Sequence, residues 1–184
     1  MNILLRLMCP SEIVDSVSQI DILELNKRRI SALLVDLDNT LVPWQGYNIQ
    51  ADVADWLRRV REAGIKICIV SNTRPLKRLR QLAAELNVPH VRRALKPRRG
   101  GFRDALSILG VESSEAAVVG DQIFTDILGG NRLGLYTILV RPILGREFIG
   151  TKISRVFEQM LLGIYSRAGM FDSSSGGPAR DKTP

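Results

Sequence analysis

Four short apolar runs separated by helix-like stretches constrain the fold of this chain more than any other feature. The runs occupy residues 32–35, 65–70, 116–119 and 136–140, the length of buried strands rather than of buried helices. The stretches with helical character cover residues 52–63, 75–87, 102–109 and 125–133, and a weaker strand is expected at residues 88–92. Strands that alternate with helices predict an α/β fold, in which helices cover both faces of a parallel sheet to give three layers.

The length and composition predict one domain with a short tail. The chain has 184 residues, of which 45% are hydrophobic, enough for one well-buried core but short for two. We therefore expect a single domain over residues 1–172. Residues 173–184 are rich in Ser, Gly, Pro and charge and predict a flexible tail. Within residues 145–168, apolar side chains recur at helical spacing and predict an amphipathic helix, which packs either on the core or on a membrane surface.

Polar side chains follow the ends of the predicted strands. The carboxyl ends of parallel strands meet at one edge of the sheet, where ligands bind at the point at which the strand order reverses. The polar residues at these positions are Asp36, Asp38, Thr40, Ser71, Asn72, Lys96, Asp121 and Asp126. An aspartate after a strand is often only a helix cap. Helix capping does not explain why four aspartates, a serine and a lysine all occur at such positions and in the order of a known motif set. The set therefore predicts one functional site.

The segments that carry these residues resemble the ordered motifs of the haloacid dehalogenase (HAD) superfamily. The matching elements are DLDNT, the serine of VSNT, the lysine of LKP and the acidic pair of GDQIFTD, within residues 30–142. The segments PSEIVDSVSQID, DLDNTLVPW and RALKP are more narrowly similar to subfamily IIIA phosphatases of the YqeG branch and to phosphatidylglycerophosphate phosphatases. The resemblance implies a Rossmann-like HAD fold and a phosphatase that depends on Mg²⁺.

The acidic residues suit the chemistry that the resemblance implies. We expect Asp36 to attack phosphorus and form an aspartyl-phosphate, and Asp38 to protonate the departing alcohol and later to activate water. Mg²⁺ prefers hard oxygen ligands, so Asp36, the backbone carbonyl of Asp38 and Asp121 are its expected ligands. We expect Asp126 to contact the residues that bind Mg²⁺ and not the ion itself.

The remaining polar residues are expected to bind phosphate. Thr40 and Ser71 offer hydroxyl groups to the phosphoryl oxygens, and Lys96 balances the charge of the carboxylates and of the phosphate. For Asn72, a role as a phosphate ligand and a role as a turn former are equally plausible. The single histidine, His90, gives little support to histidine-based chemistry.

The spacing of the motifs leaves no room for a sizeable cap domain over the site. The segments from Thr40 to Ser71 and from Ser71 to Lys96 each accommodate only a flap, a helix and a strand. An uncovered site admits a phosphate carried by a bulky molecule such as a protein, a nucleic-acid end or a lipid head group. Trp44 lies just beyond the first motif, where it either lines a flap or packs internally.

The charge of the chain favours an anionic partner. The net charge is +7 and the pI is about 9.9. Between Arg74 and Arg103 the sequence has ten basic residues and one acidic residue, Glu85, so positive charge is concentrated there. Either this is a solvated helix face, or it holds the protein on an anionic bilayer, each surface cation contributing on the order of 1 kcal/mol.

These observations lead to one hypothesis and two alternatives. The leading hypothesis is a phosphatase of phosphatidylglycerophosphate, an anionic phospholipid, at the surface of the cytoplasmic membrane. The alternatives are a phosphatase of a soluble sugar, nucleotide or phosphoprotein, and a basic nucleic-acid-binding module on a HAD fold, which the intact acidic set disfavours. The presence of only two cysteines and the lack of a signal-like start favour a location in the cytoplasm. This location is compatible with peripheral contact at the cytoplasmic face of the membrane. The sequence gives no indication of the oligomeric state.

Overall fold

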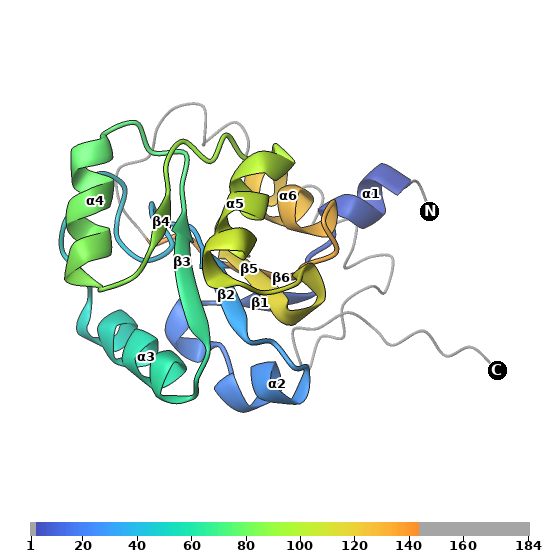
Figure 1. The fold of residues 1–184 in the computed structure, drawn as a ribbon, viewed down its shortest axis with the longest axis horizontal. Helices are drawn as coiled ribbons and strands as arrows, with labels where there is room; N and C mark the ends of the chain where they lie inside the picture. Colours follow the sequence, from blue (N-terminus) through green and yellow to red (C-terminus); the bar gives the residue numbers. More distant parts are fainter. Residues whose placement is uncertain (1–2, 144–184) are drawn as a thin grey trace.

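A computed structural model describes residues 3–143 of the chain. Its strands and helices alternate for most of this length (Figure 1). The strands are β1 (Glu12–Val14), β2 (Ala32–Val35), β3 (Lys66–Val70), β4 (His90–Val91), β5 (Ala116–Gly120) and β6 (Tyr136–Val140). The α-helices are α1 (Ile3–Met8), α2 (Ile22–Lys27), α3 (Ala51–Glu62), α4 (Leu76–Glu85), α5 (Arg99–Leu109) and α6 (Leu128–Asn131). Two 3₁₀ turns, η1 (Val17–Gln19) and η2 (Ser113–Glu115), and a π-helical turn, η3 (Ile123–Ile127), complete the elements.

The strands form one open parallel sheet in the order β1-β6-β5-β2-β3-β4. At its centre, β2 pairs with β3 on one side and with β5 on the other, so that Leu34 lies opposite both Cys68 and Val118. From β2 the chain builds outward to β3 and β4 in one direction, and then returns to build β5 and β6 in the other. The strand order therefore reverses between β2 and β5, and a ligand crevice is expected beyond the carboxyl ends of these two strands.

Alternating side chains of the central strands divide the core into two layers. Leu33 and Val35 of β2 join the cluster that contains Trp56 of α3 and the buried face of α4. Ala32 and Leu34 point to the opposite face and join the cluster that contains Phe102 of α5. The strands of the centre are buried on both faces, as near-continuous apolar runs predict for a parallel sheet. The three-layer α/β prediction is confirmed.

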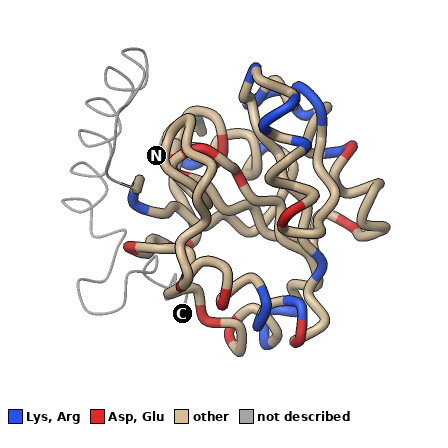
Figure 2. Tube along the Cα trace, turned by 90° about the vertical axis from the view of Figure 1, so that its left-hand side faces the viewer, with Lys and Arg blue, Asp and Glu red and all other residues tan. Residues whose placement is uncertain are grey.

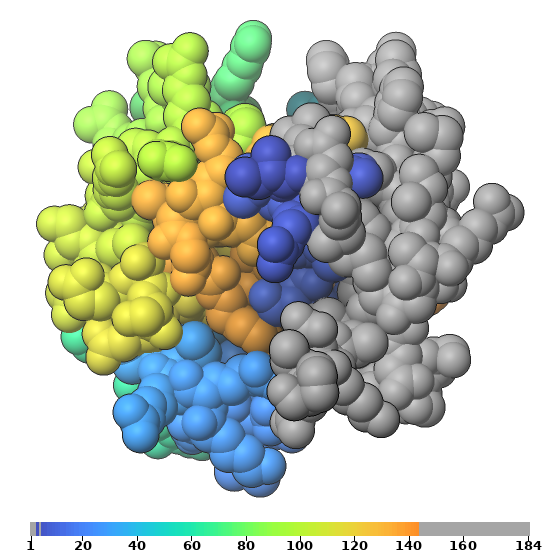
Figure 3. Space-filling view, turned by 90° about the vertical axis from the view of Figure 1, so that its right-hand side faces the viewer, coloured from blue at the N-terminus to red at the C-terminus, as the bar shows by residue number. Residues whose placement is uncertain are grey.

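The N-terminal segment lies against the C-terminal part of the described chain (Figure 3). The strand β1 pairs with β6, so that Glu12 lies opposite Ile138. The side-chain amide of Asn131 donates hydrogen bonds to the carbonyl oxygens of Leu7 and Cys9, both at 2.8 Å. These contacts add a sixth strand to the edge of the sheet that the apolar runs did not reveal.

The predicted elements agree with the structure in type and place, with one local difference. The stretch 125–133, predicted as a single regular helix, is divided into the π-helical turn η3 and the short helix α6. Between Thr40 and Ser71 the chain forms only a loop, α3 and β3, and between Ser71 and Lys96 it forms α4 and β4. No cap domain is therefore present in these segments. The helix predicted at residues 145–168 and the tail at 173–184 lie outside the described residues, as does the end of the predicted 1–172 domain.

None of the helices within residues 3–143 has the length and the apolar character that crossing a bilayer requires. The two cysteines of the chain, Cys9 and Cys68, are not joined in a disulfide, and Cys68 is buried as the sequence predicted. Burial raises the pKa of the Cys68 thiol to about 12, which keeps this thiol protonated and unreactive at neutral pH.

Trp56 is expected to be a major contributor to stability. Its ring is fully buried between α3 and the sheet, and its Nε1 donates a hydrogen bond of 3.3 Å to the carbonyl oxygen of Ile20. Replacement of Trp56 by Ala leaves a large cavity and should lower the free energy of unfolding by about 3–5 kcal/mol. Urea denaturation followed by circular dichroism measures this change.

The matched control is Leu23→Ala. Leu23 is an apolar residue of α2 with 69% of its surface exposed, so its truncation should change the free energy of unfolding by less than about 0.5 kcal/mol. Equal losses in the two variants would contradict the assignment of Trp56 to the core.

Candidate active site

A cavity of about 550 Å³ opens at the carboxyl ends of β2 and β3, beside the reversal of strand order. Its walls come from the loops that follow β2, β3, β4 and β5. The lining residues are Asp36, Asp38, Asn39, Trp44, Gln45, Ser71, Asn72, Thr73, Arg74, Pro75, Lys96, Gln122 and Thr125. The structure thus brings residues from all four sequence motifs to one cavity, as the positions after the strands predicted.

A buried lysine holds two of the carboxylates. The Nζ of Lys96 donates hydrogen bonds to Oδ1 of Asp36 at 2.6 Å and to Oδ1 of Asp126 at 2.5 Å. Burial alone would lower the pKa of Lys96, but the charges of Asp126 and Asp36 outweigh it and raise this pKa above its usual value. Lys96 is therefore a permanent cation at neutral pH, and it compensates the carboxylates that surround it.

The nucleophile predicted from the sequence keeps one oxygen available. Asp36 directly follows β2, and its backbone N–H donates to the carbonyl oxygen of Val119 at 2.9 Å, which extends the β2–β5 pairing into the site. Its Oδ1 accepts from Lys96, whereas its Oδ2 takes no hydrogen bond from the residues that the structure describes. Because Asp36 also lines the cavity, Oδ2 is the oxygen that can reach a ligand there.

Three buried aspartates form a group that can hold a divalent cation. Asp36, Asp121 and Asp126 each offer a carboxylate oxygen, and these oxygens lie within 4.8 Å of one another. Hard carboxylate oxygens are the donors that Mg²⁺ and Ca²⁺ prefer, so the donor set fits a hard divalent ion. Asp36 and Asp121 follow β2 and β5, the two strands between which the strand order reverses.

Asp126 is held more completely than the other two. Its Oδ1 accepts from Lys96, and its Oδ2 accepts from the backbone N–H of Gln122 at 3.2 Å and from the hydroxyl of Thr125 at 3.3 Å. A side chain at Gly120 would overlap the Asp126 carboxylate, so the glycine gives this buried residue its space. Burial raises the pKa of Asp126 to about 6, although Lys96 opposes the shift. With both oxygens occupied, Asp126 is better placed to orient Lys96 than to coordinate an ion.

Asp38 is paired with an arginine that the sequence did not single out. The NH1 of Arg78, from α4, lies 2.8 Å from Oδ1 of Asp38, and the Arg78 side chain is only 2% exposed. Its Nε donates to the carbonyl oxygen of Gly46 at 2.8 Å, and its guanidinium lies over the ring of Tyr47, 5.7 Å from the centroid. Arg78 thus ties Asp38 to the loop at residues 41–50 that follows the first motif.

This loop also has its own restraints. The side-chain oxygen of Asn39 accepts from the backbone N–H of Trp44 at 3.1 Å, and Oδ1 of Asp38 accepts from the N–H of Gln45 at 3.2 Å. Burial is the main cause that raises the pKa of Asp38 above its usual value, and the charge of Arg78 opposes it. Trp44 lines the cavity, which agrees with the flap position considered for it.

The hydroxyl and amide residues take different positions. Ser71 is buried and lines the cavity, and its Oγ accepts from the N–H of Thr73 at 3.2 Å, which leaves its own proton available. Asn72 makes two hydrogen bonds with the backbone of Lys96, at 2.8 and 3.0 Å, and so holds the loop that carries this lysine. Thr40 is buried, does not line the cavity, and its Oγ1 has no hydrogen-bond partner within residues 3–143.

Sequence reasoning missed several residues of the cavity. Thr73 and Arg74 follow the VSN segment directly, and Gln122 and Thr125 lie between the two acids of GDQIFTD, so their proximity to the motifs was a usable signal. Arg78 gave no such signal. It belongs to the run of basic residues between Arg74 and Arg103, for which the sequence predicts solvent exposure, yet the fold buries it against Asp38.

The sequence and the site together define the class of protein. A family model described as haloacid dehalogenase-like hydrolase matches residues 21–134. The chain belongs to this family, and it is a phosphatase of the HAD type.

Curated relatives support the narrower resemblance. The chain is 34% identical over 160 residues to the Bacillus subtilis protein named "Probable phosphatase YqeG", and the match covers 87% of this chain and 92% of the relative. It is 29% identical over 171 residues to the Arabidopsis thaliana phosphatidylglycerophosphate phosphatase 1, chloroplastic/mitochondrial. That match covers 88% of this chain and 49% of the plant protein, so the chain spans about half the length of this relative.

Solved structures support the fold. An uncharacterized protein from Listeria monocytogenes serotype 4b has a TM-score of 0.53 and 22% identity, over 65% of this chain and 85% of that one. A hypothetical protein from Xanthomonas campestris has a TM-score of 0.50 and 16% identity, over 69% of this chain and 73% of that one. At these identities the likeness concerns the fold alone.

Arg78→Met should lower phosphatase activity by about ten- to a hundredfold, because loss of the guanidinium releases both Asp38 and the carbonyl of Gly46. The main effect is expected on kcat, measured with a soluble phosphomonoester. Arg78→Lys should recover only part of the rate, since an ammonium group cannot reproduce the two-sided contact of a guanidinium.

Arg80→Met is the control for this prediction, because Arg80 lies on the same helix and is exposed. It should retain the wild-type rate. Thermal unfolding of all three variants separates a catalytic effect from a loss of folded protein. An unchanged kcat in a folded Arg78→Met variant would contradict the role of the ion pair.

Proposed function

We propose that this phosphatase hydrolyses a phosphomonoester through an aspartyl-phosphate on Asp36, with Mg²⁺ as cofactor and phosphatidylglycerophosphate as substrate. The proposal depends on how the carboxylate of Asp36 is held in the site. One of its oxygens is held by buried Lys96, and the other accepts no hydrogen bond from the described residues. Asp36 also lines the cavity, and a carboxylate oxygen of Asp121 lies within 4.8 Å of one of its own. A carboxylate restrained in this way has a defined direction of attack, which in-line phosphoryl transfer requires.

The residues of the chain have distinct roles in this reaction. Oδ2 of Asp36 attacks phosphorus, and the bond from phosphorus to the alcohol oxygen breaks. Asp38, which lines the same cavity, donates a proton to the departing alcohol oxygen. In the second step Asp38 takes a proton from the water that attacks phosphorus, the bond from phosphorus to Oδ2 of Asp36 breaks, and inorganic phosphate leaves. Ser71 and Lys96 supply a hydroxyl proton and positive charge beside the phosphoryl group.

Asp36, Asp121 and the backbone carbonyl of Asp38 are the proposed ligands of the cation. When bound, Mg²⁺ neutralises negative charge on the phosphoryl oxygens and so allows a carboxylate to approach an anionic phosphate. Asp126, whose oxygens accept from Lys96, Gln122 and Thr125, is proposed to orient the lysine instead of binding the ion. Thr40 and Asn72 are proposed to shape the loops that carry these groups.

Three observations support a phospholipid substrate. The cavity has no cap domain over it in the segments between the motifs, so a bulky phosphate carrier can approach. Lys and Arg gather along the edge of the molecule at the carboxyl ends of the strands (Figure 2). Positive charge at this edge favours binding to an anionic membrane surface. Two relatives, from Arabidopsis thaliana and Chlamydomonas reinhardtii, are named phosphatidylglycerophosphate phosphatases. We propose that the protein works at a membrane surface.

Asp36→Asn should reduce phosphate release by at least about a thousandfold, because an amide cannot act as the nucleophile. Removal of divalent ions with EDTA should abolish wild-type activity, and added Mg²⁺ should restore it. Phosphate release with and without Mg²⁺ measures both effects. Asp104→Asn, a change at an exposed acid of α5, serves as the control. Retained turnover in a folded Asp36→Asn variant would refute the mechanism.

The substrate proposal predicts a preference for phosphate presented on a bilayer. Phosphatidylglycerophosphate in anionic vesicles should give a kcat/KM at least about tenfold above that of soluble sugar phosphates and nucleotides. A higher salt concentration should reduce the difference in kcat/KM between the vesicle substrate and the soluble substrates, because salt screens the attraction between surface charges. Equal or better turnover of small soluble phosphomonoesters would leave the phosphatase chemistry intact and exclude the lipid assignment.

A further inference from the structure

A second, outer chamber of about 710 Å³ adjoins the catalytic cavity. The two share four lining residues, Asn72, Thr73, Arg74 and Lys96, so they form one continuous cleft. The inner part contains Asp36 and Asp38. The outer part extends along the loop between β4 and α5, residues 92–98. A molecule whose phosphate lies at Asp36 can therefore extend its other end into the outer chamber.

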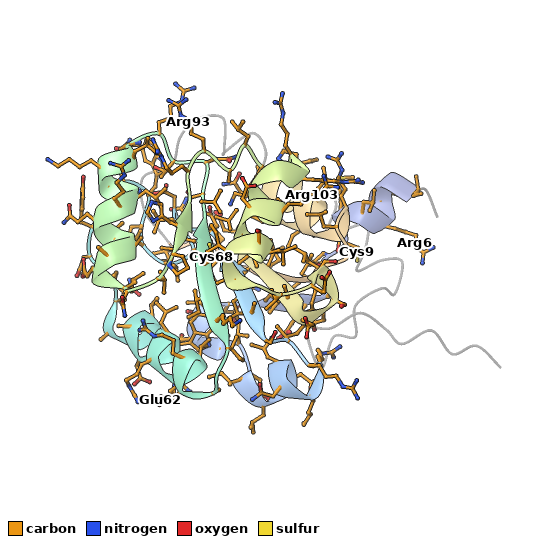
Figure 4. The ribbon with its side chains drawn as sticks, in the orientation of Figure 1. Arg6, Cys9, Glu62, Cys68, Arg93 and Arg103 are labelled. Carbon is orange, nitrogen blue, oxygen red and sulfur yellow. The ribbon has the colours of Figure 1, made fainter. Side chains whose placement is uncertain are left out.

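The outer chamber is basic. Arg74, Arg93 and Arg98 line it, and neither aspartate nor glutamate does so within the described chain. Lys96 also contributes to the wall, but its charge is already matched by Asp36 and Asp126. Figure 4 shows Arg93 projecting from the carboxyl edge of the sheet, at the opposite end of the molecule from Glu62. The three arginines are thus a local excess of positive charge that the catalytic groups do not use.

Hydrogen bonds hold the wall of this chamber in place. The side chain of Asn72 makes its two hydrogen bonds with the backbone of Lys96. The N–H of Ala94 donates to the carbonyl oxygen of Ser71 at 3.3 Å. A side chain at Gly101 would overlap Ala94, so close packing against α5 also fixes the loop. The loop that forms this wall of the chamber is therefore held in place by hydrogen bonds and by packing against α5.

The backbone of the same loop adopts an unfavourable conformation. Arg93 and Leu95 have φ angles of 50° and 52°, in the left-handed region that bulky side chains rarely occupy. Such conformations persist where the surrounding structure enforces them, and they concentrate at ligand-binding segments. In this loop, one of the two residues with this conformation, Arg93, lines the outer chamber.

We propose that the outer chamber binds a second phosphate group of the substrate, through Arg74, Arg93 and Arg98. Guanidinium groups match the oxygens of a phosphate with paired hydrogen bonds. The ligand class is a molecule with a phosphomonoester at one end and a further phosphate, either a diester or a monoester, along its length. This inference rests on the proposed function in one respect, since it places the scissile phosphate at Asp36.

The test compares two soluble substrates and two variants. One substrate is glycerol phosphate, which carries a single phosphate, and the other is a water-soluble, short-chain phosphatidylglycerophosphate, which also carries a phosphodiester. The double variant Arg93→Asn and Arg98→Gln removes two positive charges, and Asn tolerates the left-handed backbone at position 93. Arg103→Gln is the control, because Arg103 is exposed near the same edge but does not line the chamber.

The double variant should raise KM for the two-phosphate substrate by about tenfold with little change in kcat, and leave glycerol phosphate within about twofold. Arg103→Gln should change neither substrate. An equal loss for both substrates, or no loss for either, overturns the proposal, since the arginines would then only attract anions in general or have no role.

A third substrate separates this inference from the lipid assignment. Fructose 1,6-bisphosphate has two phosphates and no lipid. If the wild type rejects the phosphatidylglycerophosphate but cleaves the bisphosphate with a KM that rises about tenfold in the double variant, the subsite stands and the lipid proposal falls. If the arginine dependence is absent with every two-phosphate substrate that the wild type cleaves, the subsite falls whatever the substrate.

Discussion

The contact of one buried ammonium with two carboxylates is the interaction on which the site depends. Lys96 comes from the loop before α5, Asp36 from the end of β2, and Asp126 from η3, so three separate parts of the fold meet at its Nζ. Burial of a lone charge would be strongly unfavourable, and a cluster of carboxylates without a cation would repel itself. Each group is therefore tolerated because the others are present. The same fold that pairs the strands therefore also brings these three charged groups together.

The centre of the fold could be predicted from the sequence, and its edge could not. The apolar runs at β2, β3, β5 and β6 belong to strands buried on both faces, so hydrophobicity alone marks them. By contrast, β1 has three residues, all of intermediate burial, and gives no such pattern. The π-helical turn at η3 was also missed, because a helical apolar period does not reveal how Asp126 must turn to meet Lys96 and the N–H of Gln122.

The site was predictable to the extent that it follows strand ends. Asp36, Ser71 and Asp121 each follow a strand, and topology places their residues at one edge of the sheet. Arg78 shows the limit of this reasoning: it lies in a run of basic residues, and only the packing of α4 against the loop after β2 makes it a buried partner of Asp38. Composition describes how much charge a segment carries, whereas burial of one member depends on tertiary contacts that no local pattern encodes.

The pairing of β1 with β6 affects how the chain can assemble during translation. Ser11 and Thr137, which join these two strands through their backbone and side chains, are 126 positions apart. At ribosomal rates of about 5–20 residues per second, the first strand waits on the order of ten seconds before its partner emerges. The central strands can pair during this interval. β1 therefore cannot take its place in the sheet until β6 has been synthesised.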